Sequence, residues 1–63
     1  MIEKIYSFVE PHITGGYCKV TITTTQILNF MHGIQRKEPR YAGATDTDLI
    51  NEFCTIHWCK EET

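Results

Sequence analysis

The pattern of apolar and polar positions predicts an amphipathic helix over residues 23–37, TTTQILNFMHGIQRK. At about 100° per residue, one arc of this helix gathers its large apolar side chains, which are Ile27, Leu28, Phe30, Met31 and Ile34. Three threonines mark its start, and Thr23 stands in capping-box spacing with Gln26. Pro39 marks its end, because proline disfavours helical backbone at the residue before it. We expect this helix to be the centre of the core.

A second amphipathic helix is predicted to open at residues 45–48, TDTD, and to continue through residues 49–59, LINEFCTIHWC. Thr45 or Thr47 can cap its first turn, and the two aspartates there suit the positive end of the helix dipole. Its apolar arc comprises Leu49, Ile50, Phe53, Cys54 and Ile56. We expect the end of this helix to fray, residues 60–63 to form a solvated tail, and residues 38–47 to be a linker.

The first segment, residues 1–13, supports two interpretations. It is rich in β-branched and aromatic residues and is followed by the turn signal Thr14-Gly15-Gly16 and by an alternating segment at residues 17–23, which together predict a β-hairpin. Cys18, Val20 and Ile22 would then face one way, and Tyr17, Lys19 and Thr21 the other. The apolar positions of the first segment also match helical spacing, so the alternative is a short first helix with strands paired between two chains.

These elements predict a small two-layer α+β domain over residues 1–63, with an N-terminal β-hairpin followed by two amphipathic helices. The alternative fold is mainly α with one short strand.

The composition is typical of one small folded domain, because 41% of the 63 residues are hydrophobic and 22% are charged. The formal net charge of −2 gives no general attraction to phosphate, so nucleic acid is an unexpected partner. No apolar run reaches the length of about 18 residues that a membrane span needs, and no signal peptide is visible. The three cysteines are an odd number, which suits free thiols, so we expect a cytoplasmic protein without membrane association.

Cysteine and histidine residues raise the question of a metal site. Cys54 and His57 are spaced to lie on one helix face, and His12 and Cys18 are the remaining candidate ligands. Cys59 would lie on another side of a continuous helix, and the tandem cysteine pairs typical of zinc sites are absent. We therefore expect no metal and no cofactor.

Catalysis by a thiolate and an imidazole would need Cys54 and His57 to meet in a concave site. A domain of this size has little volume for a substrate pocket, so we expect no enzyme. His57 nevertheless lies near the middle of an apolar arc. Either a partner inside the core satisfies its ring, or the ring lies at an interface.

A short basic cluster lies near the end of the first predicted helix. It contains Arg36, Lys37 and Arg40, with Tyr41 beside it and Glu38 within it. Such a cluster is typical of a solvated helix end, and it can also contact an acidic protein surface or stack and grip a nucleic acid.

The sequence therefore favours a small intracellular protein-binding module, a regulator or inhibitor that forms a homodimer with Trp58 at or near the interface. The residues expected to contact a partner are Trp58, Arg36, Lys37, Arg40 and Tyr41. Short chains of this kind are frequent among accessory proteins of phages and mobile elements, which is an association only. The alternatives are a nucleic-acid-binding transcriptional regulator and a zinc-stabilised minidomain.

Overall fold

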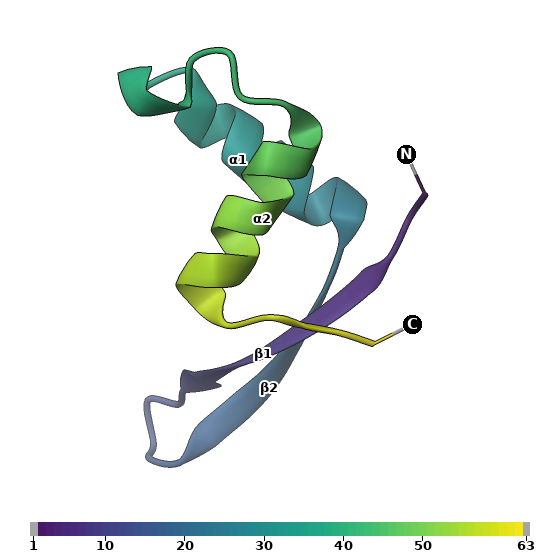
Figure 1. Cartoon of the computed structure of the whole chain (residues 1–63). Coiled ribbons are helices and arrows are strands. Elements are labelled where there is room, and N and C mark those ends of the chain that lie inside the picture. The colour runs from purple at the N-terminus through teal and green to yellow at the C-terminus, as the bar shows by residue number, and fades with distance from the viewer. Residues whose placement is uncertain (1, 63) are drawn as a thin grey trace.

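Two helices cover one face of a three-stranded antiparallel sheet in the computed structural model, which describes residues 2–62 (Figure 1). The elements in chain order are β1 (Ile5–Pro11), β2 (Tyr17–Thr23), α1 (Thr24–Gln35), the 3-10 turn η1 (Pro39–Tyr41), α2 (Asp46–His57) and β3 (Lys60–Glu61). The predicted α+β fold with an N-terminal hairpin is confirmed, and the mainly α alternative is wrong. No helix within residues 2–62 is both long enough and apolar enough to cross a membrane.

The hairpin forms because the chain can reverse at two glycines. Gly15 and Gly16 have φ angles of 100° and 72°, in the left-handed region that glycine adopts without strain. The amide of His12 donates to the carbonyl of Gly16 at 3.0 Å and closes the turn. The register that follows pairs Phe8 with Val20.

The third strand corrects our prediction for the C-terminal residues. β3 pairs with β1 on the side away from β2, so the sheet order is β2-β1-β3 and β1 is central. Its register sets Tyr6 against Glu61 and Ser7 against Lys60. The expected tail therefore belongs to the sheet up to Glu61, and Thr63 lies outside the described residues.

The start of α1 has the predicted capping box. The Thr23 hydroxyl accepts from the amide of Gln26, and the Gln26 side chain accepts from the amide of Thr23. We had expected any of the three threonines to cap the helix, but only Thr23 does so, and Thr24 and Thr25 have other partners. The Thr24 hydroxyl accepts from the amide of Lys4 at 2.9 Å, and the Thr25 amide donates to Glu3 at 2.8 Å, so both tie the helix to the segment before β1.

The second helix also begins as predicted, with Thr45 rather than Thr47 as its cap and Asp48 completing the box. Its end does not fray. Trp58 adopts the left-handed conformation with φ of 58°, and the amide of Cys59 donates to the carbonyl of Cys54 at 3.1 Å, the long closing bond of a Schellman-type cap. The helix therefore stops at His57, and the chain turns into β3.

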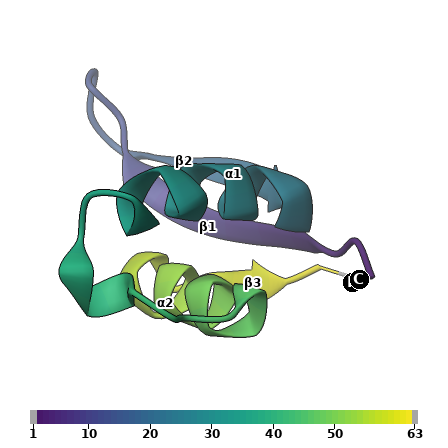
Figure 2. The ribbon, with the colours of Figure 1, turned by 90° about the horizontal axis from the view of Figure 1, so that it is seen from above.

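The two helices cross each other over the sheet (Figure 1), and the segment between them returns the chain along the domain to the start of α2 (Figure 2). The core between helices and sheet contains Phe8, Ile27, Met31, Tyr41, Leu49, Ile50 and Phe53. Phe30 belongs to the predicted apolar arc of α1 but is 53% exposed, with its ring against Phe53 at 5.9 Å between centroids. Ile56 is equally exposed, so the helices leave apolar side chains uncovered.

Candidate functional site

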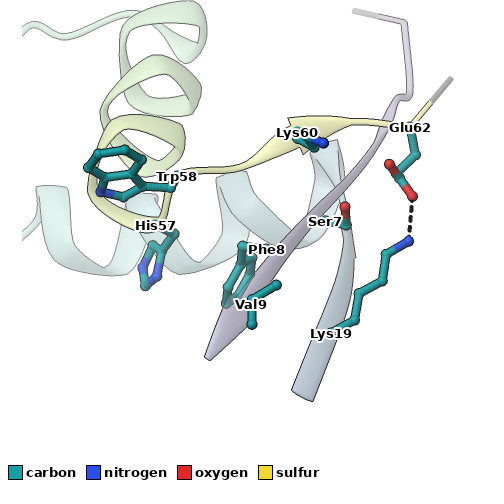
Figure 3. Close-up of a pocket in the computed structure, with 8 residues that line it drawn as sticks. All are labelled: Ser7, Phe8, Val9, Lys19, His57, Trp58, Lys60 and Glu62. Atoms are coloured by element: carbon teal, nitrogen blue, oxygen red, sulfur yellow. Dashed lines mark hydrogen bonds and ion pairs between the residues drawn. The ribbon is translucent and has the colours of Figure 1, made fainter. Parts of the chain in front are cut away.

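A groove of about 460 Å³ opens where the end of α2 passes the edge of β1 (Figure 3). It is lined by Ser7, Phe8, Val9, Lys19, His57, Trp58, Lys60 and Glu62. Aromatic side chains from β1 and α2 lie on its helix side, and charged side chains from β2 and the β3 segment lie on the outer face of the sheet (Figure 3).

Aromatic rings in mutual contact, tilted or edge to face, lie on the helix side of the groove and in the core behind it. The imidazole of His57 lies against Phe53 at 4.3 Å and against Phe8 at 5.0 Å between ring centroids. Phe8 and Phe53 also meet edge to face at 6.0 Å. His57 is half-buried, and no ring nitrogen of the described residues is buried without a partner. The histidine is thus held by stacking, and none of the core hydrogen-bond partners expected for its ring bonds to it within residues 2–62.

Trp58 stands at the rim, where it projects from the end of α2 (Figure 3). Its side chain is 87% exposed, although tryptophan is among the residues that gain most from burial. The left-handed backbone at this position costs about 1 to 2 kcal/mol for a residue with a Cβ. A large apolar ring held outside the core at such a cost is typical of a contact residue.

Beside the groove, no strand formed by residues 2–62 pairs with the backbone of β1 on the side away from β2. The amide of Glu62 donates to the carbonyl of Ile5 at 2.7 Å, so the odd-numbered residues of β1 point their amides and carbonyls towards β3. β3 reaches only as far as Ser7. Beyond it, the amide and carbonyl of Val9 and the carbonyl of Pro11 face an open edge.

Charges on the outer face are partly paired. The ammonium of Lys19 lies 2.7 Å from the carboxylate of Glu62, and this hydrogen bond holds the pKa of Glu62 below its ordinary value. A second ion pair, between Lys4 and Glu61 at 2.9 Å, lies on the other face of the sheet, because Glu61 stands opposite Tyr6. Lys60 is exposed and makes no ion pair with any residue in the described range 2–62. One positive charge therefore borders the open edge without a direct ion pair, although it helps to lower the pKa of the nearby Glu62.

The predicted basic cluster lies elsewhere, at the end of the domain that holds η1 (Figure 1). Arg36, Lys37 and Arg40 are exposed there, and the guanidinium of Arg40 lies 4.8 Å from the ring centroid of Tyr41. Tyr41 itself is buried, and its hydroxyl donates to Glu52 at 3.3 Å. Its ring belongs to the core and is not free to stack on a base. The structure brings Arg40 and Tyr41 together but separates both from Trp58.

The candidate metal ligands do not converge. The His12 ring bonds to the Thr14 hydroxyl at 2.7 Å in the hairpin turn, and Cys18 lies on β2. Nowhere in residues 2–62 do three His, Cys, Asp or Glu side chains gather closely enough to hold a metal ion. Burial, together with the neighbouring Cys54, raises the pKa of the Cys59 thiol to about 11, so this thiol is protonated at neutral pH.

Sequence reasoning singled out Trp58 and His57, which both line the groove, but none of its other residues. Val9 and Lys60 acquire their significance from the length of β3, which no periodicity reveals in two residues. The left-handed backbone of Trp58 could not be predicted either, because the left-handed residue that ends a helix is usually glycine. Comparisons of the chain with protein families, with curated proteins and with solved structures found no match.

Proposed function

We propose that the protein is a small binding module, a regulator or inhibitor that acts by contacting another protein through the groove and Trp58. One observation carries this proposal: Trp58 is 87% exposed at the rim of an open groove whose helix side carries the rings of Phe8 and His57 in contact with each other. Protein interfaces are enriched in tryptophan and bury such residues at their centre.

The remaining features support a protein partner over other classes of ligand. The groove is open and lies at a sheet edge, which suits a polypeptide better than a small substrate. The net charge of −2 and the burial of Tyr41 disfavour a nucleic acid at the basic cluster. The protonated Cys59 thiol and the stacked His57 disfavour nucleophilic catalysis.

We also place the protein in the cytoplasm, because its three cysteines are free thiols, which a reducing compartment preserves. An origin among phage or mobile-element accessory proteins stays a prediction.

The proposal is tested by affinity capture with the tagged protein from lysates of the cells that produce it. Trp58→Ala should abolish capture of the partner, whereas Tyr17→Ala should leave it intact. Tyr17 is the matched control, because it is also a surface aromatic residue, 76% exposed, but lies on β2 outside the groove. Capture should survive raised salt. An unchanged set of captured proteins with Trp58→Ala, or capture of nucleic acid that is lost steeply as salt rises, would contradict the proposal.

A further inference from the structure

The sheet has one incomplete strand position. β1 spans Ile5–Pro11 and β2 accompanies it along its whole length, but β3 consists of Lys60–Glu61 only. In line with β3, beside Val9 and Pro11, the position of a third strand is empty. The groove described above is this position, because its lining comes from both faces of the sheet around Val9 (Figure 3).

The empty position has unused hydrogen-bonding groups. Val9 can donate once and accept once, and Pro11 can accept once although it has no amide hydrogen. Their neighbours Phe8 and Glu10 point towards β2, as the bond from His12 to Gly16 in the same ladder shows. Sheet edges of this kind bind an extended polypeptide by main-chain hydrogen bonds.

We propose that an extended segment of another protein binds as an additional strand beside Val9, continuing the line of β3. This inference rests on the proposed function and names the kind of partner that the groove takes. The segment would satisfy Val9 and Pro11 with its backbone and would pass directly under the rim formed by Trp58.

A second copy of the chain does not fit this position in the same way. Two β1 strands paired about Val9 would set Pro11 of one copy opposite Ser7 of the other. Lys60 already occupies the place opposite Ser7. Symmetric pairing centred on Val9 is therefore blocked after a single residue pair, and the occupant that we propose is a different chain.

The two faces of the added strand meet different surroundings. The place opposite Phe8 falls to Cys59 in the register of β3, so the added strand begins opposite Val9. Side chains alternate along a strand, so its residue opposite Glu10 would lie on the helix side of the sheet, the side that carries the rings of Phe8 and His57. Its neighbour opposite Val9 would lie on the outer face next to Lys60, which makes no direct ion pair in residues 2–62 because the nearby Glu62 pairs with Lys19. The recognised segment therefore combines an apolar residue with an adjacent acidic residue.

The test uses random linear peptides displayed on phage and selected against the full-length protein. Selected peptides, synthesised with a fluorescent label, should carry an apolar residue beside an acidic one. Val9→Pro should weaken their binding at least tenfold by anisotropy, because it removes the amide hydrogen that faces the groove. Thr21→Pro is the matched control: by the same alternation it removes an outward amide from the free edge of β2, and it should leave binding unchanged.

Val9→Pro could lose binding because it misfolds, so a chemically synthesised form of the protein serves as a second test. Replacing the Val9 amide by an ester deletes the same hydrogen without adding a ring, and circular dichroism verifies the fold. Peptides that bind the ester form as tightly as the wild type would overturn strand addition. If their binding were still lost with Trp58→Ala, the groove would remain a protein-binding site and only the strand mode would fall. Selection of no peptide above background would also overturn strand addition. The proposed function would be contradicted only if affinity capture from lysates failed as well.

Discussion

The hydroxyl of Thr24 accepts a hydrogen bond from the amide of Lys4 at 2.9 Å and donates one to the carbonyl of the same residue at 3.3 Å. The Thr24 amide also donates to that carbonyl, at 3.0 Å. A buried threonine thus fixes the chain just before β1 onto the first turn of α1.

Thr24→Ala should therefore lower the free energy of unfolding by about 1 to 3 kcal/mol, because the Lys4 amide loses its partner in a partly buried place. Thr24→Ser retains the hydroxyl and should cost clearly less. Urea denaturation of the two variants measures the difference. Equal losses for both would show that the hydroxyl bonds contribute nothing.

Ile27 is the most deeply buried apolar side chain of α1, with 0% exposure. Ile27→Ala should cost about 2 to 5 kcal/mol of unfolding free energy, which is a large part of the stability of so small a domain. Ile34 is only half-buried, so Ile34→Ala should cost less. Gly33→Ala is the control on the same helix: nothing lies within 4 Å of the added Cβ, and the change should be neutral or stabilising by up to about 1 kcal/mol. Thermal denaturation that ranked the three differently would contradict this packing.

Acid should weaken the attachment of the N-terminal segment. Hydrogen bonds from the Thr25 hydroxyl and amide lower the pKa of Glu3 below its ordinary value of 4.5. The carboxylate therefore contributes stability that is fully present above pH 4.5 and is lost as the pH falls through the lowered value. Denaturation midpoints at neutral and acidic pH should differ less for Glu3→Gln than for the wild type. Glu10→Gln is the control, since the Glu10 side chain makes no hydrogen bond or ion pair to residues 2–62, and it should keep the wild-type dependence.

The helices and the hairpin follow from local signals, and those parts of the fold were predictable. Thr23 with Gln26 and Thr45 with Asp48 form the two capping boxes, and Gly15 and Gly16 reverse the hairpin as their conformational freedom allows. Each signal acts within a few residues, where sequence spacing and spatial contact coincide.

The candidate site was less predictable, because it depends on contacts between distant segments. Tyr41 lies in a segment that looks like a linker, yet η1 turns its ring into the core. Val9 is an ordinary strand residue until β3 stops at Lys60 and leaves the edge beside it open. Only the tertiary structure contains that information.

Self-association stays a prediction. Trp58, Phe30 and Ile56 are large apolar residues that the folded chain leaves at least half exposed. Light scattering at high micromolar concentration should return about twice the 7.3 kDa of one chain, and Trp58→Ala should lower that mass. Val9→Pro should leave it unchanged, because Lys60 blocks symmetric pairing of β1 about Val9; a mass that fell with Val9→Pro would show that a second copy pairs along β1 in another register. A mass of one chain for the wild type would refute the dimer without affecting the groove.

The central claim is that the edge of β1 beside the groove is open to an incoming strand, and amide hydrogen exchange at Val9 tests it most directly. In the free protein the Val9 amide should exchange with solvent much faster than the amides of Phe8 and Glu10, which point into the ladder with β2. A bound peptide should slow exchange at Val9 and leave its two neighbours unchanged. Protection of Val9 equal to that of Phe8 and Glu10 in the free protein would contradict the account, because the edge would then already be occupied.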